Sequence, residues 1–455
     1  MEAYGGDTLP GRIFGNHARC MHKKTHDSAK KELNDGNKGM AYLKRKLSVK
    51  RSRVLLRYKY YEQKSGRLNM GKMITPEFAA RYNSVLGWCT KAVDSLADRL
   101  QFTGFEDDTF DLMGIYNANN PDVIFDSAIT SALIGSCCFI YIAENGFGVP
   151  HMQVIDGANA TGEIDPTTNL LTEGYAVLSR DADKGTVLMD AYLVPGETII
   201  YDYVEKTEQS FRSNAPAPLL VPIINRPDAK RPFGHSRISR SCMNLQNQAR
   251  MTLTRTNVSA EFYSFPQRYV LGMADDAEFD SARATMSAFL ALYRDEDGNI
   301  PQVGQFSQQS MEPHINQFKM CAAAFAGETG LTMDDLGFAT ENPTSAEAIK
   351  SSHEILRLTA RKAQRTFGTG FLNAGYLAAC LRDDYTYSRA AVYQTTPHWA
   401  PIFEPDATQM SGIGDAAIKI NQAVPGYFDK NSLETLTGIR AGAEAGNDTT
   451  GSTEE

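Results

Sequence analysis

The sequence predicts an α+β fold that is mainly helical, and two observations support this prediction. Two long stretches, at about 75–104 and 238–263, repeat their apolar residues every three or four positions, which is the spacing of one helix face. Between about 120 and 225 the chain instead has short apolar runs, such as CCFIYIA and VLMDAYLV, separated by Gly, Asn, Asp and Pro. Its 455 residues are enough for two or three domains with a sizeable core.

The first strong helix is predicted to begin near residue 75. Thr75 can act as its N-cap and Pro76 as its first helical residue. Apolar and aromatic residues follow at helical spacing as far as Leu100, and Gly104 is expected to end the helix.

A helix of some 25 residues is predicted after NRPDAKRPFGHS. Residues spaced three or four positions apart form one narrow stripe, or seam, along a single face of this helix: Ile238, Cys242, Leu245, Ala249, Thr252, Thr256, Ala260 and Tyr263. The rest of its surface is polar: Asn244, Gln246, Asn247, Gln248, Arg250, Arg255 and Asn257. So thin a seam favours packing edge to edge with copies of the same helix while another face meets water.

A small module is predicted next, between two helices. Pro266 prevents the first helix from continuing, and QRYVLGM, a helix at about 276–294 and NIPQVGQFSQ make up roughly forty residues. The segment EPHINQFKMCAAAFAGETG is then expected to be a helix whose alanines allow close contact with another helix.

A long helix is predicted after the glycine-rich and acidic loop GLTMDDLGFATENP. Thr344 and Glu347 have capping-box spacing, so the helix would run from Ser345 to about Arg382. Three glycines, at positions 368, 370 and 375, are expected to permit a bend. Shorter helices are predicted at about 411–423 and 431–437, and GAEAGNDTTGSTEE has the composition of a disordered acidic tail.

Charge is distributed unevenly along the chain, whose formal net charge is -8. Residues 1–60 contain 15 Lys+Arg and 5 Asp+Glu. The remaining residues contain 31 Lys+Arg and 49 Asp+Glu, a formal net charge of -18. A basic amino-terminal arm therefore precedes an acidic body. Such an arm can bind nucleic acid or an acidic partner, or it can be a solvated tail.

Cysteine usage and hydropathy favour a reduced, soluble protein. The seven cysteines form no CxxC pair, which predicts buried free thiols and folding in the cytosol. The longest apolar run, ALIGSCCFIYIA, is too short to span a bilayer as a helix, so a membrane protein is not expected.

The motifs that would indicate an enzyme are weak. GRLNMGKM matches the phosphate-binding loop at Gly66, Gly71 and Lys72, but Met73 replaces the hydroxyl that holds magnesium and no buried strand precedes it. No histidine has a second ligand at metal-binding spacing, and the adjacent carboxylates Asp334-Asp335 and Asp383-Asp384 are more typical of surface charge than of a metal site. We therefore predict no catalytic residue, metal or cofactor.

Contact with a nucleic-acid backbone is the remaining alternative. Arg357, Arg361 and Arg365 recur every four residues on the predicted long helix, and Arg250 and Arg255 lie on the earlier one. These side chains could meet phosphate oxygens, acids of a neighbouring subunit, or water. No compact basic recognition helix is present in the sequence, so sequence-specific readout is not expected.

Three segments resemble a known family. PFGHSRISRSCMNLQNQARMTLTRTNVSAEFYSFPQRYVLG (232–272) resembles the central segment of portal proteins of long-tailed bacteriophages, in which a stem helix ends at an Ala-Glu-Phe-Tyr, Pro-Gln-Arg-Tyr junction. GETGLTMDDLGFATENPTSAEAIKSSHEIL (327–356) is similar to that family's tunnel loop and long kinked helix, and WAPIFEPDATQMSGIGDAAIKI resembles its approach to the carboxy-terminal helices.

The resemblance implies a portal fold with an α/β wing, a two-helix stem, a small α/β clip, a long kinked helix and a helical crown. The implied boundaries are a basic arm at 1–59, wing at 60–235, stem helix at 236–264, clip at 265–308, second stem helix at 309–328, tunnel loop at 329–344, long helix and wing return at 345–400, crown at 401–440 and tail at 441–455.

The resemblance also implies a function. Copies of the chain, typically twelve in this family, would form a ring at one capsid vertex, the conduit through which double-stranded DNA is packaged and ejected. Implied partners are the major capsid protein, scaffold protein, the large subunit of the terminase motor and head-completion or adaptor proteins. The chain would be assembled in the host cytoplasm and reside in the virion.

Site residues follow from the same resemblance. DNA-facing residues of the tunnel loop would be Glu328, Thr332, Met333, Asp334, Asp335 and Glu341, and the stem-to-clip junction would be Phe262, Tyr263, Phe265, Pro266 and Arg268. Acidic tunnel walls would let a polyanion slide, whereas lysines would grip it. Another phage head or adaptor protein, and a nucleotide-driven DNA motor, are the alternative interpretations.

Overall fold

The computed structural model describes residues 37–64, 66–70, 75–144, 146, 148–264, 268–271, 302–305, 310–338, 351–403, 405 and 407–439. The chain divides into two compact units. The first unit consists of Met1–Tyr58, Val93–Arg237 and Glu354–Glu455, and the second of Lys59–Ala92 and Ile238–His353. The prediction placed all of 60–235 in one domain, whereas the structure groups 59–92 with the two predicted stem helices.

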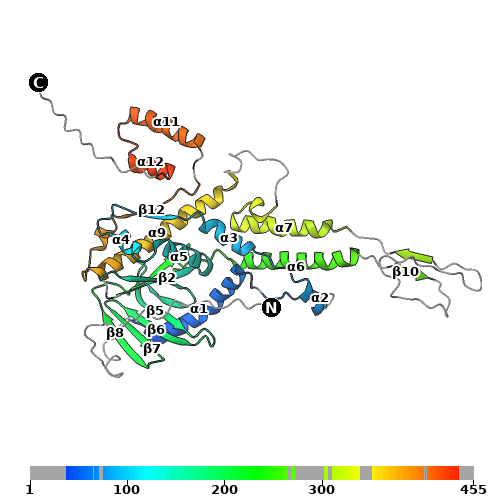
Figure 1. The fold of residues 1–455 in the computed structure, drawn as a ribbon, viewed down its shortest axis with the longest axis horizontal. Helices are drawn as coiled ribbons and strands as arrows, with labels where there is room; N and C mark the ends of the chain where they lie inside the picture. Colours follow the sequence, from blue (N-terminus) through cyan, green and yellow to red (C-terminus); the bar gives the residue numbers. More distant parts are fainter. Residues whose placement is uncertain are drawn as a thin grey trace, which may run out of the picture. The chain divides into compact units, whose positions relative to one another are not determined.

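The first unit contains the sheets (Figure 1). Five antiparallel strands follow one another in the order β4-β5-β6-β7-β8, and three more form a second sheet in the order β3-β2-β9. A two-stranded sheet pairs β1 with β12. The strands are β1 (Phe102–Glu106), β2 (Cys137–Ala143), β3 (His151–Asp156), β4 (Ala160–Ile164), β5 (Leu171–Arg180), β6 (Val187–Val194), β7 (Glu197–Asp202), β8 (Thr207–Arg212), β9 (Leu220–Ile224) and β12 (Thr396–Trp399). The predicted runs CCFIYIA and VLMDAYLV are confirmed as β2 and β6.

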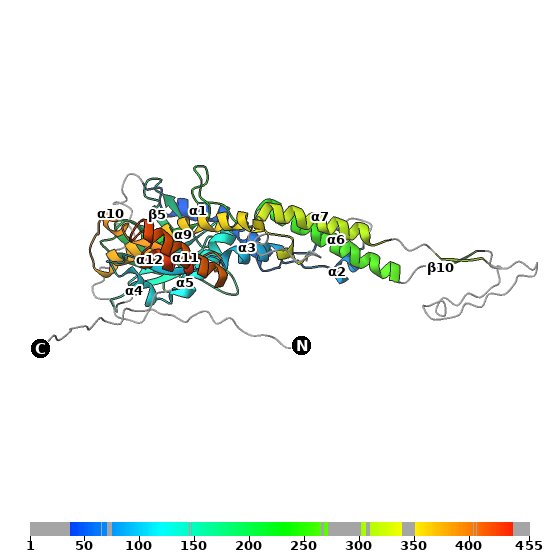
Figure 2. The ribbon, with the colours of Figure 1, turned by 90° about the horizontal axis from the view of Figure 1, so that it is seen from above.

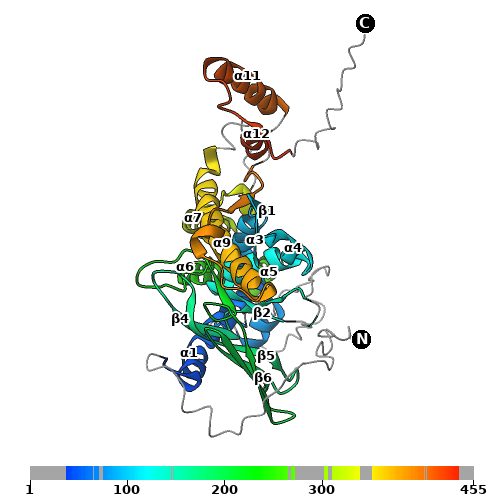
Figure 3. The ribbon, with the colours of Figure 1, turned by 90° about the vertical axis from the view of Figure 1, so that its left-hand side faces the viewer.

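Helix α1 (Met40–Tyr61) packs on the five-stranded sheet (Figure 3). Its Leu43 and Leu47 are buried together with Tyr175, Val177 and Tyr192 of that sheet. The sequence prediction missed this helix and assigned 1–59 to a partly flexible arm. Few residues identify its inner face, because only Leu43, Leu47 and Val54 are buried along its length.

Charged groups of the sheet also hold α1 in place. The carboxylate of Glu173, which is 1% exposed, accepts hydrogen bonds from the backbone N–H groups of Lys38 (3.1 Å) and Gly39 (3.0 Å), just before the helix begins. Lys44 Nζ lies 3.0 Å from the buried carboxylate of Asp190. A carboxylate near a helix N-terminus satisfies free N–H groups and the helix dipole.

Helices α5 (Pro121–Gly135) and α9 (Glu354–Arg382) pack on the three-stranded sheet, and α4 (Leu112–Asn117) packs on α9. Helix α9 continues through all three of its glycines, so the bend expected there does not interrupt the helix, and a turn at His353 precedes it. The glycines serve close packing. A Cβ atom on Gly368 would lie 2.9 Å from Pro397 Cβ, and one on Gly370 would lie 2.7 Å from Ile223 Cδ1.

Short helices complete the first unit: α10 (Arg389–Val392), α11 (Ala407–Ala423) and α12 (Lys430–Thr437). The last two confirm the predicted helices near the carboxyl terminus. The six cysteines in the described residues are buried and free, as predicted, while Cys20 lies outside them. No helix in the described part of the chain is both long and apolar enough to cross a bilayer.

The second unit is built on helices α6 (Arg240–Ser264) and α7 (Glu312–Thr329), which run side by side (Figure 2). Helix α2 (Pro76–Arg81), the first turns of α3 (Trp88–Ala97) and the 3-10 turn η1 (Asp334–Leu336) belong with them. A single helix was predicted from 75 to 104, but 83–87 are not helical. Beyond α6, β10 (Arg268–Leu271) pairs antiparallel with β11 (Gln302–Gln305), while the predicted helix at 276–294 lies outside the described residues.

Candidate functional site

The polar face of α6 is covered by an earlier segment of the same chain. Gln246 Oε1 accepts a 2.7 Å hydrogen bond from Cys89 N, and Asn247 Nδ2 donates to Tyr60 Oη at 2.6 Å. Thr254 Oγ1 accepts from Ser84 N at 3.3 Å. The prediction that this polar face meets water or a tunnel is therefore wrong for Gln246, which is buried, whereas Asn244, Gln248 and Asn257 of the same face are exposed as predicted.

Arg250 is the centre of this arrangement. The whole residue is 1% exposed, and its Nε donates to Ser84 O at 2.9 Å while Nη2 donates to Gly66 O at 3.2 Å. Burial lowers the pKa of its guanidinium. Arg250 was predicted as a DNA or subunit contact, and the structure corrects this: its hydrogen-bonding groups face the protein interior, so none is presented to a phosphate.

These bonds also explain why the predicted helix at 75–104 breaks. Ser84 donates its backbone N–H to Thr254 and accepts from Arg250 at its backbone C=O, and these bonds to side chains of α6 replace helical hydrogen bonds. Asn83 and Ser84 are weak helix formers, so little local preference opposes the break. The interruption is thus a consequence of tertiary contacts with α6.

Trp88, at the start of α3, joins the same arrangement to α7. Its ring lies 5.3 Å from the Phe318 ring and 5.4 Å from the Phe325 ring, both on α7. Outward-facing positions of the helix pair stay exposed, among them Asn244 and Gln248 of α6 and Met320, Ala323 and Ala324 of α7. One side of the helix pair is therefore internal to the chain, and another is available to a partner.

A compact turn follows α7, within the predicted tunnel loop. Gly330 ends α7 in the left-handed conformation, at φ 69°, where glycine carries no Cβ penalty. Asp335 Oδ2 accepts from both N and Oγ1 of Thr332 at 2.9 Å, and Thr332 Oγ1 accepts from Asp335 N at 3.1 Å. The Phe338 ring returns to within 5.5 Å of the Phe318 ring. The turn is thus held by its own side chains and by α7.

This turn separates the roles of its acidic residues. Asp335 is half-buried and organises the backbone, whereas Asp334 is exposed. Glu328, also exposed, accepts a 2.8 Å hydrogen bond from Ser239 Oγ. Met333 is half-buried, and Glu341 lies outside the described residues. Asp334 and Glu328 are therefore the predicted DNA-facing acids that the described residues show as exposed.

The structure describes little of the predicted stem-to-clip junction. Phe262 and Tyr263 belong to the last turn of α6, and Arg268 begins β10, but only their backbones are described. Phe265 and Pro266 lie outside the described residues. The predicted change from helix to strand across 264–268 is confirmed, while the roles of these side chains remain predictions.

The remaining predicted arginines are on or near the surface. Arg255 of α6 is half-buried, and Arg361 and Arg365 of α9 are exposed. Arg357 Nη2 lies 2.6 Å from Glu354 Oε1, an ion pair within α9. That carboxylate raises the pKa of Arg357. Arg357 is therefore already partnered by an acid, which leaves Arg361 and Arg365 as the more available cations.

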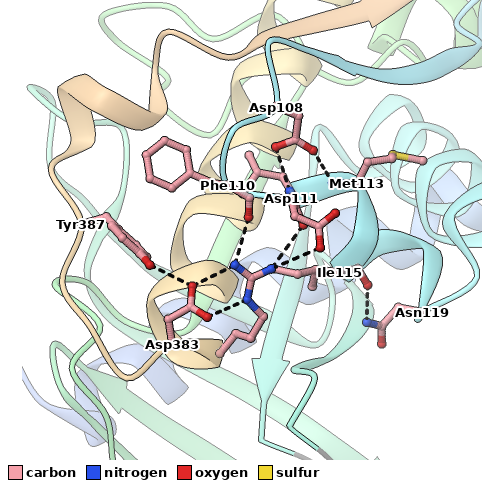
Figure 4. Close-up of polar contacts among 10 residues, drawn as sticks. Asp108, Phe110, Asp111, Met113, Ile115, Asn119, Asp383 and Tyr387 are labelled. Carbon is pink, nitrogen blue, oxygen red and sulfur yellow. Dashed lines mark hydrogen bonds and ion pairs between the residues drawn. The ribbon is translucent and has the colours of Figure 1, made fainter.

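Sequence reasoning missed a polar network at the end of α9 (Figure 4). The Arg382 guanidinium donates to Phe110 O at 3.0 Å and to both carboxylate oxygens of Asp383 at 2.8 Å. Tyr387 Oη donates to Asp383 at 3.0 Å. The Arg382 hydrogen bonds hold the pKa of Asp383 below its usual range. Asp383 is exposed, as predicted for surface charge, and its ion pair orients Arg382, which anchors the α9 terminus to the loop before α4.

The same close-up shows how α4 begins (Figure 4). The two carboxylate oxygens of Asp108 accept 2.8 Å hydrogen bonds from Leu112 N and Met113 N, which are free N–H groups of the first helical turn. Asp384, the other member of the predicted carboxylate pair, accepts from Asn214 Nδ2 at 2.8 Å. Both carboxylates of the pair are therefore used as hydrogen-bond acceptors within the fold.

The enzyme-like motif has an unsuitable context. GRLNMGKM follows α1, whereas a phosphate-binding loop follows a strand, and the described part of the motif belongs to no helix or strand. The carbonyl of Gly66 is taken by Arg250. Within the described ranges, no group of three or more His, Cys, Asp or Glu is placed to hold a metal ion.

Comparison with known proteins gives consistent matches. The family described as phage portal protein, SPP1 Gp6-like, matches residues 41–410. The portal protein of Mycobacterium phage L5 is 26% identical over 316 residues, and that of Mycobacterium phage D29 is 25% identical over 315 residues. Each match covers 64% of this chain and 64% of the relative, so the chain matches slightly less than two thirds of the length of either.

Two solved structures are similar to the chain, with low sequence identities and low TM-scores. One is from the virion of a native gene transfer agent particle, with a TM-score of 0.35 and 13% identity over 85% of this chain and 99% of that chain. The other is from the neck of that type of particle, computed with C12 symmetry, with a TM-score of 0.40 and 12% identity over 77% and 89% of the two chains. At these TM-scores neither likeness carries an argument.

Proposed function

The chain belongs to the SPP1 Gp6-like family of phage portal proteins, and on this premise we propose that copies of it form a ring at one vertex of the phage head. Double-stranded DNA would pass through the central tunnel of this ring during packaging and again at ejection. The role is structural: the ring guides the DNA and receives other proteins.

The family match carries this proposal. It extends over residues 41–410, which includes α1, the three sheets of the first unit, the α6 and α7 pair and α9. Of the three segments on which the sequence resemblance rested, 232–272 and 327–356 lie inside it, and 399–420 lies partly inside it. The structure adds that α6 and α7 form a helix pair with one side closed by the chain itself and another side exposed, as side-by-side packing in a ring would require.

Charge favours passage of a polyanion. Duplex DNA carries about one negative charge per 1.7 Å, so clustered lysines on a tunnel wall would bind it and slow its movement. The chain beyond residue 60 has a formal charge of -18, and the turn after α7 exposes Asp334. We propose that this turn faces the DNA and keeps contact with it weak.

Native mass measurement of the purified chain tests the ring. The expected result is a closed species near twelve times the 50.1 kDa mass of one chain. A monomer at every concentration, with or without capsid proteins, would refute the proposal.

A charge substitution tests the DNA-facing role of the turn. Asp334→Lys should slow packaging at least several-fold, whereas Asp334→Asn should change it less, because only lysine adds a cation that binds phosphate. Asp335 is unsuitable for this test, since its carboxylate holds the turn through Thr332. Packaging at the wild-type rate in rings of the Asp334→Lys chain would show that the turn does not meet DNA.

Other partners are proposed for the remaining parts of the chain. The module between α6 and α7 would receive the terminase large subunit during packaging and head-completion or adaptor proteins afterwards. The basic arm and the first unit would meet the scaffold protein and the major capsid protein. The ring would assemble in the host cytoplasm and remain in the virion.

A further inference from the structure

Helix α1 has an outward face that combines cations with exposed apolar side chains. Arg45, Val49, Arg53 and Leu56 repeat at helical spacing on this face. Val49 is 63% exposed and Leu56 is 45% exposed, and both arginines are exposed. No ion pair is recorded for either arginine among the described residues. Lys44 and Lys46 of the same helix point the other way, to Asp190 and Glu163 of the sheet.

A second surface of the first unit has the opposite charge. Asp122 and Asp126 lie in the first turns of α5 with Val123, which is 68% exposed, and Asp98 follows α3. Burial and the neighbouring carboxylates of Asp122 and Asp98 raise the pKa of Asp126. Within the part of the chain that the structure describes, none of these three carboxylates forms an ion pair.

The two surfaces lie at opposite ends of α5. Its last residue, Gly135, accepts a hydrogen bond from Arg57 of α1 at 3.3 Å, and Val54 lies against it. Asp122 is thirteen residues earlier, or about 20 Å away at the rise of an α-helix. In Figure 2, α1 lies at one edge of this unit and α4 and α5 lie toward the other.

We propose that the outward face of α1, formed by Arg45, Val49, Arg53 and Leu56, docks on the acidic surface of Asp98, Asp122, Val123 and Asp126 in a neighbouring copy of this chain. This inference rests on the proposed ring and names the surfaces that close it. A ring needs two different, complementary surfaces on each copy, placed so that one copy's first surface meets the next copy's second. Opposite charge at separated ends of one unit meets that requirement.

The apolar side chains favour a protein partner for α1 over nucleic acid. Phosphate and sugar give Val49 and Leu56 little to pack against, whereas Val123 of the acidic surface is equally exposed and apolar. The charges would fix the orientation and the partner, and the apolar side chains would supply the buried area.

Charge reversal in both directions tests the pairing by native mass or sedimentation of the full chain. Arg45→Glu with Arg53→Glu, and separately Asp122→Lys with Asp126→Lys, should each weaken ring formation about tenfold or more at equal chain concentration. All four substitutions in one chain should restore assembly to within about threefold of wild type, because every interface then pairs opposite charges again. Lys184→Glu and Asp183→Lys, in the exposed turn before β6, are controls expected to assemble as wild type.

Circular dichroism and thermal unfolding of each variant distinguish a loss of folding from a loss of assembly. If both reversal variants assemble as wild type, or if the fourfold variant folds but assembles no better than either pair, the pairing is wrong while the ring stands. If the variant with Arg45→Glu and Arg53→Glu forms normal rings and loses only its binding of duplex DNA, the outward face of α1 binds nucleic acid and the inference is overturned. A wild-type chain that never forms rings would overturn both this inference and the proposed function.

Discussion

Arg250 provides the sharpest test of the second unit, because the sequence and the structure assign it different roles. As a DNA contact it would be dispensable for folding. As a buried donor to Ser84 O it holds residues 82–92 against α6. Arg250→Met keeps most of the aliphatic stem and removes the guanidinium, so the substitution isolates the hydrogen bonds from the packing.

The expected free-energy cost of Arg250→Met depends on the two carbonyl groups, of Ser84 and Gly66, that lose the guanidinium as a hydrogen-bond donor. Ser84 is half-buried, and a buried carbonyl left without a partner costs about 1–3 kcal/mol. Gly66 is exposed, so water can replace the guanidinium at its carbonyl and the cost there is small. We therefore expect local opening of 82–92 to become easier by about 2 kcal/mol, which corresponds to about 30-fold faster exchange.

Hydrogen–deuterium exchange by mass spectrometry measures this opening. In Arg250→Met, peptides that cover 82–92 should exchange about 30-fold faster, while peptides from β5 to β7 should not change. Arg255→Met, on the same helix and half-exposed, is the matched control and should alter exchange less than about twofold. Unchanged protection of 82–92 in Arg250→Met, together with weaker binding of duplex DNA, would refute the structural role.

Two further predictions concern α9. Gly368→Ala should lower the free energy of unfolding by about 1–3 kcal/mol, because the new Cβ would lie 2.9 Å from the rigid ring of Pro397. Gly414→Ala in α11, which has open space around it, is the control and should raise the free energy of unfolding by about 0.5–1 kcal/mol. Equal effects of the two substitutions in chemical denaturation would contradict the packing argument. The pKa of Asp383 is depressed in the folded chain, so its contribution is present above the unfolded pKa of about 3.9 and is lost as pH falls through the folded pKa. The Tm of Asp383→Asn should accordingly lie below that of wild type at pH 6, and the difference should narrow as the pH falls below the unfolded pKa of about 3.9. A difference that stays constant over this range would exclude the ionised pair as its cause.

Several elements were predictable because their signal is local. The strands β2 and β6 are apolar runs bounded by turn residues, and α6, α7, α11 and α12 have caps, breakers or helical periodicity in their own sequence. Helix α1 was missed because its outward face carries Val49, Leu55 and Leu56, which reduces the contrast with the buried Leu43, Leu47 and Val54. Helix α5 was missed within the region of about 120–225 that was interpreted as strands, and no element was predicted for the residues of α4.

Some features of the candidate site could likewise be predicted from the sequence, and others could not. The sequence by itself determined the family, the helix pair, the acidic turn and the charge asymmetry of the chain, since motifs, composition and periodicity are properties of consecutive residues. Only the tertiary structure decided that Arg250 is internal, that Asp335 holds a turn while Asp334 is exposed, and that Asp383 is neutralised by Arg382. The physical reason is that burial and partnership depend on contacts between distant residues, such as Ser84 with Arg250, and such contacts leave no periodic trace in either segment.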